Sequence, residues 1–224
     1  IFAITQKFAK LLKNKAKIKP EKIHVIYNGI FFHTDSEIPA KYEHPYFNII
    51  NVARAEKVKG QALMLKALKR LDDDHIRLHI AGDGAELDAL KKLAQKLDLS
   101  PQVAFHGFLS KKELEQLYQI TDLAVLTSFS ESFPLVLLEA SDNLVPILST
   151  DVGDIKMMIP DFEHGFIAKI GNVESIANAI EEAVNKPKKE LEQIAVNEKR
   201  YLESHFSIKN QLQSIEKVYN LIIK

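Results

Sequence analysis

Short apolar runs alternate with amphipathic segments along most of this chain. The apolar runs predict β-strands over residues 23–27, 47–53, 75–81, 102–106, 122–127 and 146–150. Helical spacing predicts α-helices over residues 60–71, 86–97, 111–120 and 134–142. Strands that are apolar on both faces, each followed by a helix, indicate a parallel sheet covered on both sides. With right-handed crossovers, the predicted fold class is α/β, a Rossmann-like doubly wound parallel sheet.

The two ends of the chain follow other patterns. Residues 1–17 have helical spacing, with Phe8, Leu11 and Leu12 among lysines. Three further helices are predicted over 173–185, 188–204 and 208–223, and a long loop over 33–45 separates the first segment from the sheet. The chain begins with Ile1 rather than methionine, so we expect residues 1–22 to be the tail of a missing N-terminal domain. The pattern of elements then predicts 23–185 as the Rossmann-like domain and 186–224 as extra C-terminal helices.

Composition narrows the functional classes. Thirty basic residues balance thirty acidic ones, which argues against a nucleic-acid partner but not against a local phosphate site. The chain contains no cysteine and no apolar run near the roughly 18 residues of a membrane span. We therefore expect a cytoplasmic protein. The basic segment over residues 1–17 leaves open a peripheral contact at the inner face of the membrane, although a connecting helix with solvated lysines is favoured.

No metal site is predicted. His75 and His79 lie four residues apart, but in a predicted strand, where they do not form a helical metal pair. The acidic run over residues 72–74 falls at a helix end and is interpreted as a solvated turn.

In a parallel α/β sheet, ligands bind beyond the carboxyl ends of the strands, so the loops that follow the strands carry the candidate chemistry. Arg54 and Lys59 follow the strand at 47–53, and a guanidinium and an ammonium both suit a diphosphate. Gly60 then opens a helix whose free N–H groups would reinforce an anion site.

A glycine turn with Gly82 and Gly84 follows the next strand. Glycine lets the backbone approach a ligand closely or adopt a positive φ angle. The stretch GDGAEL lacks the third glycine of a dinucleotide-binding loop, and no acidic residue ends the following strand. These departures disfavour a nicotinamide or flavin cofactor, and none is predicted.

The stretch SFSESFPLVLLEA at 128–140 holds two glutamates around a predicted helix start. Glu131 lies in the loop, Pro134 is well placed to start the helix, and Glu139 lies between one and two turns into it. Carboxylates near a diphosphate would be repelled, so they should contact hydroxyl groups, and a carboxylate matches the vicinal diol of a ribose. The spacing of the two glutamates alone is common in helical proteins.

Six stretches together carry a family resemblance. They are HVIYNG (24–29), NVARAEKVKG (51–60), HIAGDGAEL (79–87), VAFHGFLSKKEL (103–114), SESFPLVLLEA (130–140) and STDVGD (149–154). Each is weak alone, but six in family order are specific. The chain resembles, over residues 22–185, the C-terminal donor-binding domain of the family 4 retaining glycosyltransferases, which have the glycosyltransferase-B fold. The resemblance implies transfer of a sugar from a UDP-, GDP- or ADP-sugar to a glycan or lipid-linked acceptor, in polysaccharide or cell-envelope synthesis.

The resemblance also assigns roles to residues. Arg54 and Lys59 match the basic pair that binds the donor diphosphate and stabilises the leaving group without a metal. Glu139 matches the glutamate that holds the ribose hydroxyls, and Glu131 matches the one that contacts the donor sugar near the reacting carbon.

The remaining expected contacts lie in three loops. The backbone around Phe133, Pro134 and Leu135 would support the phosphate and sugar, and residues 107–109, with Phe108 and Leu109, would receive the nucleobase. Gly82 and Gly84 would bring the chain close to the nucleotide.

Two positions depart from the family pattern. The family often has glycine where this chain has Ser132 and Pro134, and proline has no N–H to donate. Asp154 replaces a second glycine and could alter the sugar end of the pocket.

Two alternative functions stay open. One is a nucleotide-sugar epimerase with the same fold, and the other is a non-catalytic module that binds nucleotide sugars. The acceptor site in this fold lies mainly on the N-terminal domain, so we expect little or no transfer by these residues alone.

Overall fold

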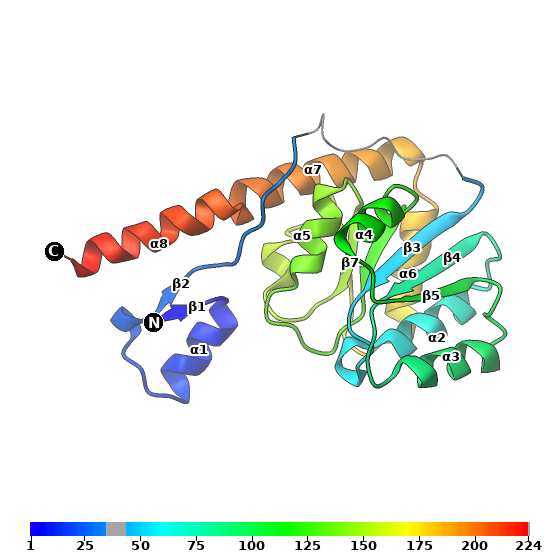
Figure 1. Cartoon of the computed structure of the whole chain (residues 1–224), viewed down its shortest axis with the longest axis horizontal. Helices are drawn as coiled ribbons and strands as arrows, with labels where there is room; N and C mark the ends of the chain where they lie inside the picture. The colour runs from blue at the N-terminus through cyan, green and yellow to red at the C-terminus, as the bar shows by residue number, and fades with distance from the viewer. Residues whose placement is uncertain (35–43, 224) are drawn as a thin grey trace.

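The main body of the protein is a six-stranded parallel β-sheet (Figure 1). The computed structural model describes residues 1–34 and 44–223. The sheet consists of β3 (Phe47–Val52), β4 (Ile76–Ala81), β5 (Val103–Gly107), β6 (Leu123–Leu126), β7 (Ile147–Thr150) and β8 (Phe166–Ala168). Their order is β5-β4-β3-β6-β7-β8, so the chain winds outward in both directions from the adjacent strands β3 and β6. This is the doubly wound α/β arrangement that the sequence predicts, and its topological switch point lies between β3 and β6.

Helices cover both faces of this sheet. On one face, α2 (Gln61–Leu71), α3 (Leu87–Lys96) and α6 (Val173–Val184) form a core with β3, β4 and β5 that includes Ile49, Leu65, Leu78, Leu90 and Ile180. On the other face, α4 (Lys111–Tyr118), α5 (Leu135–Asp142) and α7 (Lys188–Phe206) pack over β3, β6 and β7 through Ile50, Leu117, Leu138, Ile147 and Leu202. The predicted helices from residue 60 onward are each present, with ends shifted by up to two residues, whereas the helical segment predicted over 1–17 is a shorter helix, α1 (Gln6–Asn14), preceded by a strand.

The prediction that the strands are covered on both sides is wrong toward the β5 edge of the sheet, at β5 and its neighbour β4. In β4 the residues alternate, so that Ile76 and Leu78 are buried while Arg77 and His79 are only half-buried. The second core contains no buried residue of β4 or β5, because α4 and α5 lie over the neighbouring strands. Arg77 instead stacks its guanidinium on Tyr46, 3.7 Å from the ring centroid. Burial, with the nearby His106 and His44, lowers the pKa of His79 to about 4, so that its ring is neutral at pH 7.

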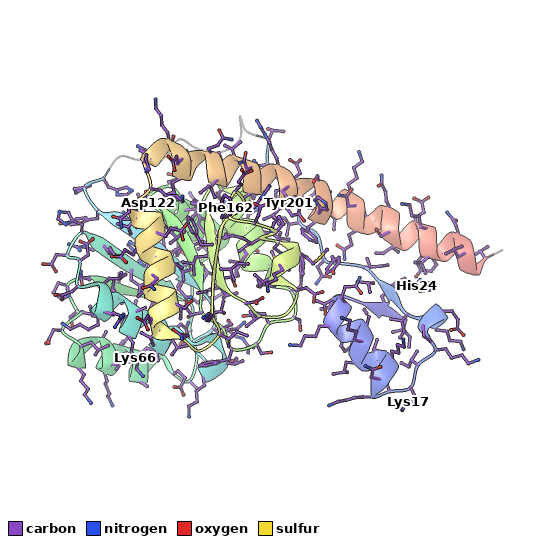
Figure 2. All side chains as sticks on the ribbon, turned by 180° about the vertical axis from the view of Figure 1, so that it is seen from behind. Lys17, His24, Lys66, Asp122, Phe162 and Tyr201 are labelled. Atoms are coloured by element: carbon purple, nitrogen blue, oxygen red, sulfur yellow. The ribbon has the colours of Figure 1, made fainter. Side chains whose placement is uncertain are left out.

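A small N-terminal unit stands beside the main sheet. It contains β1 (Phe2–Ala3), α1 (Gln6–Asn14), the 3₁₀ turn η1 (Pro20–Lys22) and β2 (His24–Val25), and β1 pairs in parallel with β2. Thr5 caps α1 by accepting a hydrogen bond from the N–H of Phe8. Lys17 and His24, both labelled in Figure 2, lie on this unit, away from the sheet.

The C-terminal helices join the two parts. α8 (Ile208–Ile222) follows α7 after Ser207 and extends past the end of the sheet domain (Figure 1). Tyr219 in α8 makes an edge contact with Phe2, at 6.3 Å between ring centroids. Leu212 and Leu221 on the same helix are more than half exposed. Among the described residues, no helix is long and apolar enough to cross a membrane.

Two short strands, β1 and β8, are absent from the predicted elements, because runs of two and three residues show no periodicity. Most of the predicted loop over 33–45 lies outside the described residues.

Candidate functional site

The loops that follow β3 and β6 are joined at the switch point. The backbone N–H of Phe129 donates to the carbonyl oxygen of Val58 at 2.8 Å, and the Thr127 hydroxyl donates to the carbonyl oxygen of Gly60 at 3.0 Å. Gly60 has a φ angle of +66°, and a Cβ atom there would lie 2.1 Å from the Thr127 carbonyl oxygen. Only glycine at position 60 therefore allows the two loops to approach this closely. Lys59 directly precedes Gly60, so the contact between the loops also sets the position of Lys59.

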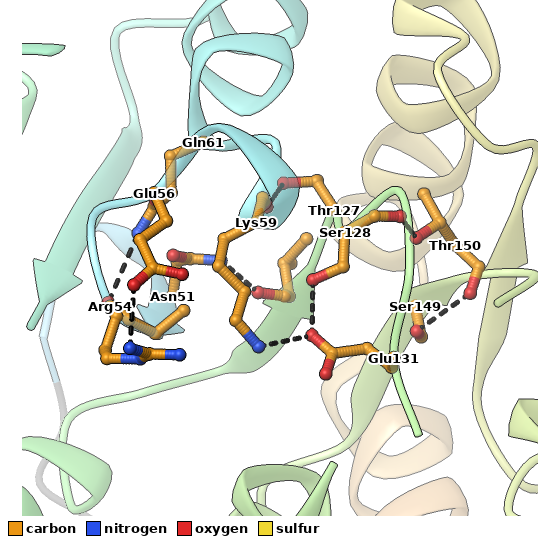
Figure 3. A network of polar contacts seen from close by, with 12 residues as sticks. Asn51, Arg54, Glu56, Lys59, Gln61, Thr127, Ser128, Glu131, Ser149 and Thr150 are labelled. Carbon is orange, nitrogen blue, oxygen red and sulfur yellow. Dashed lines mark hydrogen bonds and ion pairs between the residues drawn. The ribbon is translucent and has the colours of Figure 1, made fainter. Parts of the chain in front are cut away.

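Lys59 and Glu131 meet across these joined loops (Figure 3). The Lys59 Nζ atom lies 2.7 Å from Glu131 Oε1, although 72 residues separate the two in sequence. The Ser128 hydroxyl donates to the same carboxylate oxygen at 2.6 Å. The side chains of Lys59 and Glu131 are only 20% and 10% exposed, so the ion pair is shielded from solvent more than a surface pair. Two residues predicted to act on one ligand thus lie side by side.

Arg54 comes from the same loop but stays at the surface. Its guanidinium pairs with Glu56 at 2.7 Å and its side chain is 74% exposed. In Figure 3 it lies on the β3 side of Lys59 and does not touch Glu131. Among the described residues, the Arg54 guanidinium pairs only with Glu56, and a pair this exposed to solvent is weak.

Glu139 is half-buried in α5 and lies outside the Lys59–Glu131 contact. Burial raises the pKa of this carboxyl group, and the positive charge of Lys111, at the start of α4, opposes the shift. Burial and the charge of Glu139 together raise the pKa of the Tyr118 phenol. Glu139, on α5, therefore feels the charge of Lys111 on α4, and burial disfavours its charged form.

The three residues around the start of α5 differ in what they expose. Pro134 is the N-cap and the helix begins at Leu135, one position later than the sequence suggests. The Phe133 side chain is buried, with its ring centroid 5.4 Å from Tyr27 and 5.2 Å from Phe206, so only its backbone could face a ligand. Leu135 is partly exposed, and the Leu137 N–H donates to the Pro134 carbonyl oxygen at 3.1 Å, so the N–H groups that a helix start leaves for a ligand are those of Leu135 and the residue after it.

Gly82 and Gly84 face protein backbone. A Cβ atom on Gly82 would lie 2.0 Å from the carbonyl oxygen of Ala53, and one on Gly84 would lie 2.5 Å from that of Ala55. The missing side chains thus let the turn after β4 pack against the loop that carries Arg54. Contact of these glycines with a nucleotide stays a prediction.

Phe108 and Leu109 follow β5 and point to different environments. Phe108 is 84% exposed, whereas Leu109 packs against the second core. Of the two residues expected near a nucleobase, only Phe108 therefore presents its side chain to solvent.

Asp154 contacts the N-terminal unit. Its Oδ2 atom accepts hydrogen bonds from the backbone N–H of Gln6 at 2.6 Å and from the Tyr27 hydroxyl at 3.1 Å. Burial of the phenol and the nearby carboxylate of Asp154 raise the pKa of Tyr27 to about 12. Sequence reasoning singled out Asp154 as a departure but did not foresee this contact, because nothing in the local pattern indicates a partner 148 residues away.

Within the part of the chain that the structure describes, no group of three or more histidine, aspartate or glutamate side chains is arranged to hold a metal ion. The polar groups that converge at the switch point are an ammonium, a carboxylate and a hydroxyl. Together they can bind a ligand that carries both an anionic group and hydroxyl groups.

The sequence is similar to those of several known proteins. The chain is 29% identical over 170 residues to the N-acetyl-alpha-D-glucosaminyl L-malate synthase of Bacillus anthracis, covering 72% of this chain and 44% of that protein. It is 30% identical over 134 residues to a D-inositol 3-phosphate glycosyltransferase of Mycobacteroides abscessus, covering 58% of this chain and 30% of that protein. The chain spans less than half the length of these curated relatives.

A solved structure shares the fold. The Anabaena protein HepE, in complex with UDP and glucose, superimposes with a TM-score of 0.85 at 22% sequence identity. The match covers 98% of this chain and 62% of that one. The sequence profile of the family described as glycosyl transferases group 1 matches residues 34–200, which include both loops of the switch point. The chain therefore belongs to the glycosyl transferases group 1 family.

Proposed function

We propose that this chain is the donor-binding part of a retaining hexosyltransferase, which transfers a sugar from a nucleoside diphosphate sugar to an acceptor. The observation that carries the proposal is the contact between Lys59 and Glu131 at the switch point, 2.7 Å apart. Ligands of open α/β sheets bind at this place in the fold. The family to which the chain belongs supports transfer of glycosyl groups.

In this proposal, Lys59 and Arg54 bind the diphosphate. Lys59 exchanges its ion pair with Glu131 for the phosphate oxygens, and Arg54 leaves its exposed pair with Glu56, which costs little. The N–H groups at the start of α5, near Leu135, add hydrogen bonds and a partial positive charge. These groups stabilise the negative charge that grows on the leaving diphosphate in the transition state.

The two glutamates bind the two sugars of the donor. Glu139 accepts hydrogen bonds from the ribose hydroxyls, and the partner gained there would offset the unfavourable burial of its carboxylate. Glu131 contacts the transferred sugar near the reacting carbon. Phe133 and Pro134 take part through their backbone, while Pro134, which has no N–H, accepts but does not donate.

The nucleobase is received at residues 107–109, where Phe108 offers an exposed ring for stacking and Leu109 supports the turn from within the core. Gly82 and Gly84, which let the turn after β4 pack against the β3 loop, bring the chain close to the nucleotide. UDP-sugars are the first donors to test, because HepE, which shares the fold, was solved with UDP and glucose. GDP- and ADP-sugars follow.

The acceptor is a glycan or a lipid-linked sugar, bound by an N-terminal domain that faces this one. Residues 1–22 belong to that side, together with β2, which pairs with β1; within 23–185 the six-stranded sheet and its loops bind the donor, and 186–224 are the C-terminal helices. The product enters a polysaccharide or cell-envelope glycan. The reaction takes place in the cytoplasm, and these residues alone transfer little sugar.

A thermal-shift screen of UDP, GDP, ADP and their sugars tests the proposal. A specific ligand raises the melting temperature increasingly with its concentration relative to its Kd. We expect one nucleotide and its sugar to stabilise the protein, and Lys59→Met to abolish most of the shift. A matched control, Lys66→Met on the outer surface of α2, should leave it unchanged. If none of these ligands shifts the melting temperature, the proposed function is wrong.

A further inference from the structure

Ser128 is fixed at both its side chain and its backbone. The residue follows β6, is fully buried, and donates its hydroxyl hydrogen to Glu131 Oε1 at 2.6 Å. Its carbonyl oxygen accepts a hydrogen bond from the Thr150 hydroxyl, on β7, at 2.7 Å. Figure 3 shows this chain of contacts running from Thr150 through Ser128 to Glu131. The sheet itself therefore supports the position of the glutamate side chain.

Glu131 uses one of its two carboxylate oxygens for these contacts. Oε1 accepts from both Lys59 and Ser128, whereas Oε2 has no hydrogen bond to any described residue. An oxygen held in this way leaves the other oxygen oriented and available to accept a hydrogen bond from a sugar hydroxyl.

The two donors to Oε1 differ in what a diphosphate does to them. The ammonium of Lys59 is attracted by a diphosphate and can leave the carboxylate. The buried hydroxyl of Ser128 is neutral, so a diphosphate does not attract it in this way. Once Lys59 has turned to the diphosphate, the carboxylate would be repelled by the same anion unless another donor held it. Ser128 is the donor that stays.

We propose that Ser128 is a positioning residue that holds Glu131 against the donor sugar after Lys59 has moved to the diphosphate. The inference rests on the proposed function and adds a residue to its site. It predicts that the hydroxyl of Ser128 affects recognition of the sugar and leaves recognition of the nucleotide unchanged.

The test compares calorimetric titrations of the protein with UDP and with UDP-glucose. In Ser128→Ala we expect UDP to bind within about twofold of the unchanged protein, and UDP-glucose to bind about tenfold more weakly, as for loss of one hydrogen bond to a charged group. Ser141→Ala is the matched control, since Ser141 is equally buried and its hydroxyl has no hydrogen-bond partner among the described residues. It should change neither titration.

A second measurement separates positioning from a general structural effect. If Ser128 acts through Glu131, then Glu131→Gln should weaken binding of UDP-glucose, and adding Ser128→Ala should weaken it little further. Fully additive losses, or an equal loss of UDP and UDP-glucose in Ser128→Ala, would overturn the inference. So would unchanged binding of UDP-glucose. If the unchanged protein binds neither ligand, nor GDP, ADP or their sugars, the proposed function fails and the inference with it.

Discussion

Replacing Gly60 with alanine should damage the switch point far more than the same change at Gly107. Both glycines have nearly the same left-handed backbone, with φ angles of +66° and +64°. They differ in the space around them, because a Cβ atom on Gly60 would lie 2.1 Å from the Thr127 carbonyl oxygen, whereas none of the described atoms would lie within 4 Å of a Cβ on Gly107. Comparing Gly60→Ala with Gly107→Ala therefore separates the steric contribution to the loss of stability from the contribution of the left-handed backbone.

The expected magnitudes follow from this difference. An alanine in the left-handed region costs roughly 1–2 kcal/mol, partly offset by about 0.4–1 kcal/mol through the lower entropy of the unfolded chain. Gly107→Ala should thus lower the free energy of unfolding by about 1 kcal/mol. Gly60→Ala adds a clash with backbone that cannot rotate away, comparable with overpacking a core at about 1–3 kcal/mol. Its total loss should be about 2–4 kcal/mol.

Urea unfolding followed by circular dichroism measures both losses. Because the clash is relieved only by separating the two loops, Gly60→Ala should also weaken nucleotide binding through Lys59. Equal destabilisation by the two substitutions would refute the reasoning that close packing of the loops requires glycine at position 60.

Three further substitutions test Glu139, Asp154 and Ser110. Burial raises the pKa of Glu139 above its ordinary value of 4.5, so the folded protein binds a proton at this carboxyl group more tightly than the unfolded chain does. The resulting contribution to the free energy of unfolding is complete below pH 4.5 and is lost as the pH rises through the folded-state pKa. Glu139→Gln should therefore gain stability relative to the unchanged protein across that window, seen by urea unfolding at pH 4 and pH 7, while losing nucleotide affinity; a pH-independent difference would contradict this. Asp154→Asn should lower the pKa of Tyr27 from about 12 but leave it above 10, because burial of the phenol is the larger cause of the shift. Ultraviolet titration of the phenolate measures this pKa, and an unchanged value would contradict the prediction. Ser110→Ala, which removes the hydroxyl that accepts from the Glu113 N–H at the start of α4 but leaves the Ser110 backbone N–H donating to the Glu113 carboxylate, should cost about 1 kcal/mol in urea unfolding, and an unchanged midpoint would argue against the cap.

The central part of the fold could be predicted from the sequence because strands that are buried on both faces appear there as continuous apolar runs. The runs that became β3, β6 and β7 are apolar on both faces, and each belongs to a strand covered by helices on both sides. The edge was harder, since the alternation in β4 reports a half-open face only when the neighbouring strands are known. β8 is too short for any periodicity.

The candidate site was predictable in its residue types but not in its contacts. The position of Lys59 and Glu131 after parallel strands indicates that they share an edge of the sheet. Their ion pair, however, depends on the close approach at Gly60, which only the folded backbone reveals. The same holds for Ser128, an ordinary serine in the sequence, and for Asp154, whose contact lies on a distant unit.

We propose above that a nucleotide sugar binds at the switch point between β3 and β6. Amide hydrogen exchange of the protein with and without saturating UDP-glucose tests it most directly, because exchange slows where a ligand covers or orders the backbone. Binding there should slow exchange in the loops at residues 53–60 and 127–137 and at residues 107–109, and leave exchange in the outer helices α3 and α6 unchanged. Protection confined to the outer helices or to the N-terminal unit, with no effect in these loops, would contradict it.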